Sequence, residues 1–217
     1  MKKALLLTCI VTSALVFAAC SNNTTAPEED GSTQAPVVEM EPEALPPVDE
    51  TVQALYEGAT DIYTNISLGQ LPVDREQVYE VGDYTYYKVT DSRFADYEAF
   101  RTYLAQYFTL SFIDDEILNE NNLLLAKGED GMLYSLGSGR GTNIFYAGHT
   151  FEISHETEQE IGLKATAYYT NSATPEEEIE YFYTTPENTE DYTTQTYSFS
   201  LLKEDGAWRF DTFHLFY

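Results

Sequence analysis

The sequence predicts an α+β fold in which N-terminal helices pack on one face of a curved antiparallel sheet. Apolar residues recur at helical spacing, with one hairpin between them, across residues 49–118, whereas apolar and polar residues alternate from residue 123 onward. Helices followed by a run of strands indicate α+β rather than a parallel α/β fold. The 217 residues include 18 Tyr, 12 Phe and 1 Trp, which are enough aromatic side chains to build a folded core.

Three helices and several strands are expected from these patterns. The first helix covers residues 49–66, the second covers residues 91–108 with Asp91 or Ser92 at its start, and a third, shorter helix begins at Ser111. Residues 208–217 have apolar side chains on both faces, which is typical of a central or doubly covered strand. The expected strands cover residues 77–81, 84–89, 123–127, 132–136, 149–155, 161–169, 179–183, 197–201 and 208–217.

The N-terminus has the pattern of an export signal, in which two lysines precede an apolar run too short to span a membrane. The residues Phe17, Ala18, Ala19 and Cys20 resemble a bacterial lipobox, although that pattern prefers Leu at the position of Phe17. The resemblance implies that residues 1–19 are removed and that Cys20 receives a diacylglyceryl group. Two acyl chains anchor a protein stably, so we expect an extracytoplasmic protein on the cell membrane, or a secreted one if the lipobox is not used.

Residues 20–47 are expected to form a disordered tether between the lipidated cysteine and a single domain. After Cys20 this stretch contains five of the eight prolines, six acidic residues, and no aromatic or basic residue. Residues 48–217 have the length of one domain. Cys9 leaves with the signal and Cys20 is lipidated, so no disulfide, thiol nucleophile or cysteine metal site is expected in the domain.

Charge is the most unusual feature of the composition. The chain has 37 acidic against 11 basic residues and a formal charge of -26, and residues 51–217 alone carry -20. This balance argues against a nucleic-acid partner, which selects a basic face. It also exceeds what solubility requires, so the field of the domain is expected to steer basic protein partners toward it.

No pattern of residues predicts an enzyme, a cofactor or a metal site. His149 and His155 fall on one face of an expected strand, but their spacing is not that of a metalloprotease, and ordinary strand-end histidines are the favoured interpretation. The glycine-rich run 137–143 has backbone amides able to cradle an anion, yet it lacks the P-loop lysine and a following helix. It is interpreted as a permissive strand connection in which Arg140 organises neighbouring carboxylates or contacts a partner.

Clusters of carboxylates are the remaining candidates for a functional site. Neighbouring acids along a chain rarely supply the opposed pair of glycoside hydrolysis, and none of the clusters matches a calcium-binding loop. Most are interpreted as solvated turns. The candidate partner-binding residues are Asp114, Asp115, Glu116, Arg140, Glu176, Glu177, Glu178 and Glu180.

Several segments of residues 50–217 resemble the IseA-type D,L-endopeptidase inhibitor family of Gram-positive bacteria. The resemblance rests on aromatic and turn patterns in the segments DYTYYKVTD, YEAFRTYLAQYF, IDDEIL, GMLYSL, RGTNIFYAG and LLKEDGAWRFDTF. It implies a cystatin-like α+β fold and inhibition of secreted NlpC-type cysteine peptidases, which cut stem-peptide bonds in peptidoglycan during cell separation. Members of the family are commonly secreted, so a lipid anchor here would confine inhibition to the membrane side of the wall.

These observations lead to a first hypothesis and two alternatives. The first is a monomeric, membrane-anchored inhibitor whose acidic surface docks over the basic rim of a hydrolase cleft. The second is a small-ligand-binding lipoprotein with a cavity between the helices and the sheet, lined by Tyr103, Tyr181 and Trp208. The third is a hydrolase, which would need Asp or Glu side chains from distant strands to converge.

Overall fold

A computed structural model of the protein describes residues 50–171, 185–186 and 188–216. All of them belong to one compact unit, Glu41–Tyr217. The signal, Cys20, the tether and the expected strand at residues 179–183 lie outside the described residues. Within the described part of the chain, none of the helices combines the length and apolarity needed to cross a bilayer.

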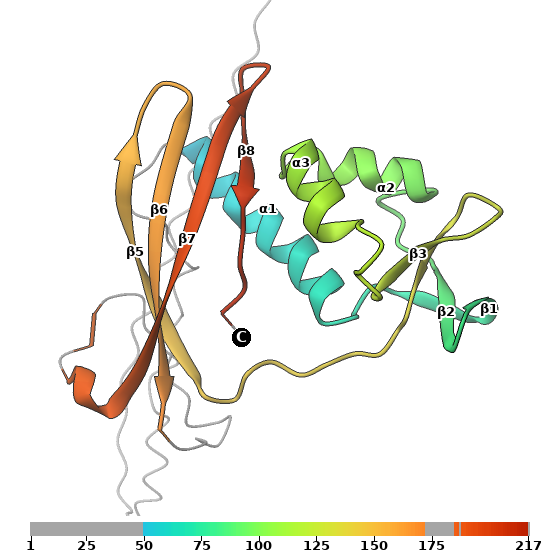
Figure 1. Ribbon diagram of the computed structural model, residues 1–217, viewed down its shortest axis with the longest axis horizontal. Helices are drawn as coiled ribbons and strands as arrows, with labels where there is room; N and C mark the ends of the chain where they lie inside the picture. The colour runs from blue at the N-terminus through green and yellow to red at the C-terminus, as the bar shows by residue number, and fades with distance from the viewer. Residues whose placement is uncertain (1–49, 172–184, 187, 217) are drawn as a thin grey trace, which may run out of the picture. The chain divides into compact units, whose positions relative to one another are not determined.

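The helices occupy the first half of the described chain (Figure 1). Helix α1, Glu50–Ser67, has one buried stripe formed by Val52, Tyr56, Ala59, Ile62 and Ile66, as its apolar spacing predicts. Helix α2, Tyr97–Leu104, is followed by the short α3, Leu110–Phe112. Helix α3 continues directly into a π-helical turn, η1, Ile113–Ile117, and a 3₁₀ turn, η3, Thr189–Asp191, precedes the last hairpin.

The second helix is shorter than predicted because other contacts compete for its ends. Asp91 does not cap it, since this carboxylate accepts hydrogen bonds from the Arg93 backbone N–H at 3.0 Å and from the Arg93 guanidinium. Asp96 is the cap instead and accepts from the Ala99 N–H at 2.8 Å. The prediction of Asp91 or Ser92 as the start was therefore wrong by about one turn.

The strands form two antiparallel sheets, where the sequence analysis described one. Sheet A has the order β1-β2-β4-β3, and sheet B has the order β5-β6-β7-β8. The chain passes from one sheet to the other through residues 136–145, in which no strand forms. The α+β class with antiparallel pairing is confirmed. The strands are β1 (Val73–Val81), β2 (Tyr84–Val89), β3 (Leu125–Lys127), β4 (Leu133–Ser135), β5 (Tyr146–Glu156), β6 (Glu160–Thr170), β7 (Tyr192–Glu204) and β8 (Ala207–Thr212).

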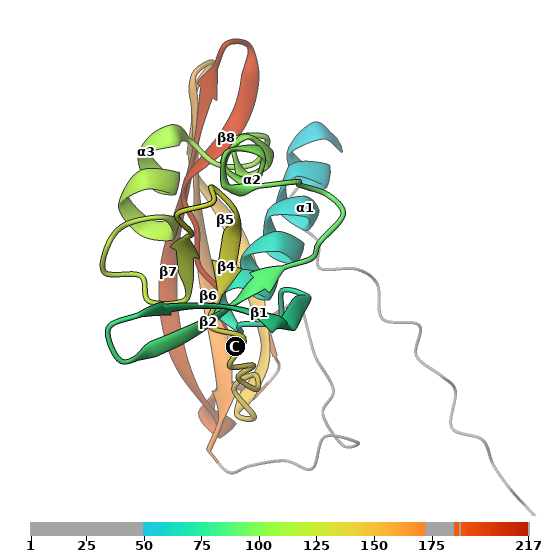
Figure 2. The same ribbon diagram turned by 90° about the vertical axis from the view of Figure 1, so that its right-hand side faces the viewer.

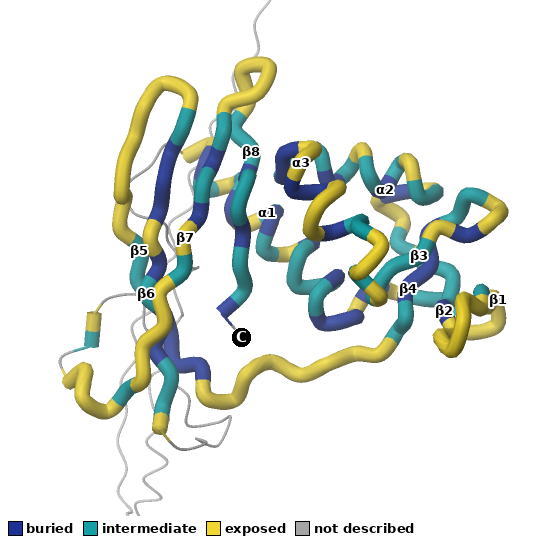
Figure 3. The backbone as a smooth tube through the Cα atoms, viewed as in Figure 1, coloured by how far each residue is buried: buried dark blue, intermediate teal, exposed yellow. Residues whose placement is uncertain are grey.

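The core lies between the helices and the inner face of sheet B (Figures 2 and 3). On strand β6 the inward-facing Ile161, Leu163, Ala165 and Ala167 are all buried, whereas on the other face Lys164 is exposed and Tyr168 is buried. Aromatic rings fill the space facing these residues. The fully buried ones are Phe100, Phe108, Phe199, Phe210 and Phe213.

Strand β8 is an edge strand of sheet B, so the central position, one of the two that were predicted, is excluded, while none of residues 208–216 is exposed. It pairs with β7 on one side only and ends at Thr212. Its other edge is covered by the turn after α2, because the Phe210 N–H donates to Tyr107 O at 2.8 Å and the Thr109 N–H donates to Phe210 O at 2.9 Å. The apolar residues on both faces therefore reflect packing under the helices rather than a central position in the sheet.

Replacing Gly58 with alanine is expected to destabilise the domain by about 1–2 kcal/mol. A Cβ at Gly58 would lie 2.2 Å from Cε1 of Tyr107, whose backbone is held by the bond to Phe210. Overpacking of this kind outweighs the gain of up to about 1 kcal/mol from better helix propensity. Urea denaturation gives the change in unfolding free energy.

Ala54→Gly is the matched control, because Ala54 is exposed on the same helix and makes the reverse exchange. It is expected to cost about 1 kcal/mol from propensity alone. A Gly58→Ala variant more stable than the unmodified protein would contradict the close approach of Tyr107.

Candidate docking site

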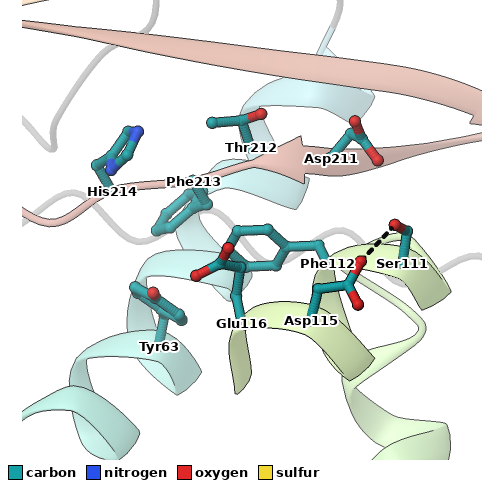
Figure 4. A pocket seen from close by; sticks show the side chains of 9 residues that line it. All are labelled: Tyr63, Ser111, Phe112, Asp115, Glu116, Asp211, Thr212, Phe213 and His214. Carbon is teal, nitrogen blue, oxygen red and sulfur yellow. Dashed lines mark hydrogen bonds between the residues drawn. The ribbon is translucent and has the colours of Figure 1, made fainter. Parts of the chain in front are cut away.

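An open hollow of about 250 Å³ lies where α1, the α3 and η1 segment and the C-terminal strand meet (Figure 4). Each of these three elements contributes both to the walls and to the core beneath them. We call this feature the acidic hollow. Its lining residues are Tyr63, Ser111, Phe112, Asp115, Glu116, Asp211, Thr212, Phe213 and His214.

Thr109 connects the two sides of the acidic hollow from below. Its side chain is 1% exposed, donates to Asp211 Oδ1 at 2.8 Å and accepts from the Phe112 N–H at 3.2 Å. Thr109 is therefore the N-cap of α3, in place of the predicted Ser111. Ser111 instead donates to Asp115 Oδ2 at 3.1 Å, as Figure 4 shows, so both carboxylates are oriented by hydroxyl groups.

The π-helical turn decides how the three predicted acids are used. The Leu118 N–H bonds to Ile113 O at 2.8 Å, which is five residues back, and Ile113 and Ile117 are buried by this wider turn. Asp114, Asp115 and Glu116 are all exposed. Asp115 and Glu116 line the acidic hollow, whereas Asp114 lies outside its lining.

Asp114 forms an ion pair rather than part of the hollow. The Arg101 guanidinium reaches its two oxygens with Nη2 at 2.9 and 2.7 Å and with Nε at 3.1 Å. Both side chains are at least a third exposed, so the pair contributes little to stability. The Arg101 cation thus neutralises Asp114, one of the three acids of η1. The negative charge of the hollow comes from Asp115, Glu116 and Asp211.

Burial shifts the proton equilibria of two residues in the walls. The pKa of Tyr63 is raised, first by burial and then by the negative charge of Glu116. The pKa of His214 is lowered by burial, although Glu116 acts in the opposite direction. His214 is therefore neutral at pH 7, and the described lining carries three carboxylates with no Lys or Arg.

Within the described residues, the hydrogen bonds of Arg140 go to backbone carbonyls rather than to the carboxylates that it was expected to organise. Its backbone N–H donates to Leu68 O at 2.7 Å, and its Nη2 donates to Ser67 O at 2.7 Å. These contacts place the cation at the C-terminal end of α1, whose own last turn has no basic residue. A positive charge is favourable there because the final carbonyls carry the negative end of the helix dipole.

A second hollow, of about 440 Å³, adjoins the acidic hollow. It shares Tyr63 and His214 with the acidic hollow and extends to Arg140, Thr142 and Asn143. Arg140 thus still lines a surface feature, although its guanidinium is used by α1. The remaining predicted residues, Glu176, Glu177, Glu178 and Glu180, lie outside the described residues.

The two histidines of β5 are separated rather than paired. His149 is 1% exposed, bonds through Nδ1 to the Tyr146 hydroxyl and lies 4.4 Å from the Phe216 ring between centroids. His155 is exposed and its Nε2 lies 3.1 Å from Glu160, because the register shifts between Ile153 and His155. In the part of the chain that is described, no group of three potential metal ligands lies together.

Of the residues proposed for a ligand cavity, the two that the structure describes, Tyr103 and Trp208, have different neighbours. Tyr103 packs between Phe94 and Tyr107, at 5.7 and 5.5 Å between ring centroids. Trp208 lies below Lys203 at the turn between β7 and β8, where it lines another open hollow, of about 500 Å³, with Glu156 and Glu158. Tyr181 lies outside the described residues.

Sequence reasoning found two of the three acids of the hollow and missed Asp211 and the aromatic walls. Asp211 stands between Phe210 and Phe213 in an otherwise aromatic C-terminal run. An acid in such a run was a usable signal, since a carboxylate near a core requires a partner. The bond from Thr109 to Asp211 spans 102 residues, and the sequence holds no local pattern for it, whereas Ser111 and Asp115 are only four residues apart.

No family model matches the chain, and no curated protein matches it. The fold and the site nevertheless define a class in structural terms. The protein is an acidic α+β domain with two antiparallel sheets and an open hollow that combines carboxylates with aromatic side chains.

Thr109→Val is expected to destabilise the domain by about 1–2 kcal/mol. The substitution keeps the shape but removes the cap of α3 and the hydrogen bond to Asp211. Thr109→Ser keeps the hydroxyl and should recover most of this loss. Chemical denaturation of the three proteins measures the effect, and equal losses for Val and Ser would contradict the role of the hydroxyl.

Lowering the pH is expected to weaken the fold through His149. Burial lowers the pKa of His149 from 6.5 to about 4, so the unfolded chain binds this proton more tightly than the folded one. The stability contributed by neutral His149 is complete above pH 6.5 and is lost as the pH falls toward 4, by roughly 3 kcal/mol.

His149→Gln removes this proton while keeping an acceptor for Tyr146. The difference in unfolding free energy between the two proteins, measured from pH 7 to pH 4, isolates the histidine from the titration of the carboxylates. The wild-type protein should lose stability relative to the variant over this range. If the unfolding free energies of the two proteins changed in parallel with pH, burial would not lower the pKa of His149.

Proposed function

We propose that the protein is a membrane-anchored inhibitor of NlpC-type D,L-endopeptidases, the hydrolases that cut peptidoglycan stem peptides. It acts as a proteinaceous inhibitor without covalent chemistry, by docking on the rim of the enzyme cleft. The observation that carries the proposal is the acidic hollow on a domain of formal charge -20. The resemblance of six segments to the IseA-type family names the enzyme class, and a cystatin-like fold and lipidation of Cys20 remain predictions.

The chemistry of the acidic hollow suits a lysine or arginine side chain of a partner. The half-buried Tyr63 offers aromatic surface to its aliphatic stem or guanidinium, and Asp115 and Asp211 offer oriented carboxylate oxygens. Because Asp115 and Glu116 are exposed, such a cation is not stripped of all its water, so the desolvation cost remains small.

The packing of the core favours docking over the alternative of a small-ligand site. A ligand cavity between the helices and sheet B would need free space where Phe108, Phe199 and Phe210 are fully buried. The described hollows are instead open at the surface and lined largely by polar residues. Apolar ligands prefer enclosed, mostly apolar pockets, whereas an acidic surface attracts a basic protein partner over a long range.

Inhibition should occur at low ionic strength and weaken as salt is added. The chain from residue 21 onward is mixed with an NlpC-type D,L-endopeptidase, and peptidoglycan cleavage is followed at rising NaCl concentration. Exposed charges are screened over about 8 Å at physiological salt and about 3 Å at 1 M. Undiminished cleavage with excess protein at low salt would overturn the proposal.

Neutralising the hollow tests whether it is the contact. Asp115→Asn with Glu116→Gln should weaken inhibition at low salt by about tenfold and flatten its salt dependence. Glu156→Gln with Glu158→Gln is the matched control, because it removes the same charge from the exposed turn between β5 and β6, outside the acidic hollow. Equal effects of the two pairs would assign inhibition to net charge. Peptidoglycan cleavage by the protein alone would support the hydrolase alternative.

A further inference from the structure

The hairpin of β1 and β2 carries an apolar face that continues beyond the sheet. Val81 pairs with Tyr84, and Tyr79 pairs with Tyr86, so these four side chains share one face of the hairpin. At the root, Tyr86 is 3% exposed and the Tyr79 ring lies 5.3 Å from that of Tyr134 in β4. The next pair, Val81 and Tyr84, is 44% and 42% exposed, so the face runs out into solvent.

The tip of this hairpin stands free of the rest of the domain (Figures 1 and 2). Gly82 begins its two-residue turn with a φ of 59°, and a side chain added there would meet nothing within 4 Å. Val78, on the opposite face, is 53% exposed. The fold requires no apolar residues at this place, because a turn of this kind is stable with polar neighbours.

The root of the hairpin is held firmly, so the tip is presented in one orientation. The Arg75 guanidinium lies 5.0 Å above the Tyr87 ring and donates to Gly137 O at 3.2 Å. Gly137 belongs to the same connection as Arg140 and Asn143, which line the hollow beside the acidic hollow. The same connection thus contributes both to the root of the hairpin and to the hollow beside the proposed docking site. An element ordered in advance loses little entropy on binding.

Charge decides which occupant suits this tip. Glu80 and Asp83 flank it and are exposed. A second copy would bring the same carboxylates and a formal charge of -20 per domain against them, so the two copies would repel each other. The register shift between Asp74 and Val78 also disturbs the free edge of β1, which disfavours pairing of that edge with another strand. An anionic bilayer would repel them as well. A protein cleft with an apolar floor and a basic rim is complementary to both parts of the tip.

We propose that the tip of the β1–β2 hairpin is a second docking element, which inserts Val81 and Tyr84 into the apolar part of the partner's cleft while its carboxylates contact the basic rim. This inference rests on the proposed inhibition, and it assigns the apolar part of binding to sheet A. Apolar anchors of this kind carry much of the affinity of an interface, with charged groups around them.

The test uses the chain from residue 21 onward carrying Val81→Thr and Tyr84→Thr, in the same cleavage assay. Threonine keeps the strand propensity, so urea denaturation should show a fold of nearly unchanged stability. Inhibition should weaken by about 30-fold, with the salt dependence of the remaining inhibition retained. Ile153→Thr is the control, because it removes a 36% exposed apolar side chain from β5.

The outcomes separate this inference from the function on which it rests. If the unmodified chain inhibits and the tip variant inhibits equally well, the tip is not a docking element and the proposed function stands. If the tip variant and Ile153→Thr weaken inhibition equally, a specific role of the tip is likewise overturned. If the unmodified chain does not inhibit the enzyme, both the proposed function and the docking role of the tip are contradicted. Sedimentation that shows a dimer lost in the tip variant would assign the tip to a second copy instead.

Discussion

Two backbone hydrogen bonds to Phe210 hold the helical layer on the edge of sheet B, and the rest of the structure depends on them. They join the turn after α2 to β8, so the free edge of the sheet is closed without another strand. The same contact brings Thr109 under Asp211, and from there one hydroxyl caps α3 and orients a carboxylate. Aromatic rings from α1 and from the segments before α3 and after β8 meet around this junction, with Phe108 and Phe213 at 5.6 Å between centroids. The acidic hollow is therefore a surface consequence of how the core is closed.

The scarcity of basic residues makes each of their positions informative. Arg93 bonds to Asp91 and, at 2.6 Å, to Asp61 of α1, which fixes the segment before α2 against the first helix. Hydrogen bonds from Arg93 hold the pKa of Asp91 below its usual range. Arg101 pairs with Asp114, Arg75 holds the root of the β1–β2 hairpin, and Arg140 caps α1. These four arginines bind elements of the fold to one another, and two acids of the hollow, Asp115 and Asp211, bond to hydroxyl groups instead.

Local sequence patterns predicted most of the individual helices and strands, but few of the contacts and strand pairings between them. The stripe of α1, the hairpin with its turn at Gly82 and the alternation of β6 depend on neighbours in sequence, and all three are present as expected. The start of α2 and the cap of α3 were misassigned, because Asp91 and Thr109 have tertiary partners that compete with the simplest capping interpretation. The division into two sheets could not be read from alternation, which says which residues are buried but not which strand pairs with which.

The sequence by itself determined the α+β class, the acidic charge and the short helical segment that carries Asp115 and Glu116. Those features follow from composition and from spacing over a few residues, because local sterics and solvation depend on neighbouring residues alone. Only the tertiary structure decided that Asp211 joins them, that Asp114 is withdrawn by Arg101, and that Arg140 serves the end of α1. It also decided that the hairpin tip stays uncovered. Each of these depends on contacts between residues far apart in the chain, whose free energies arise only when helices and sheets have packed.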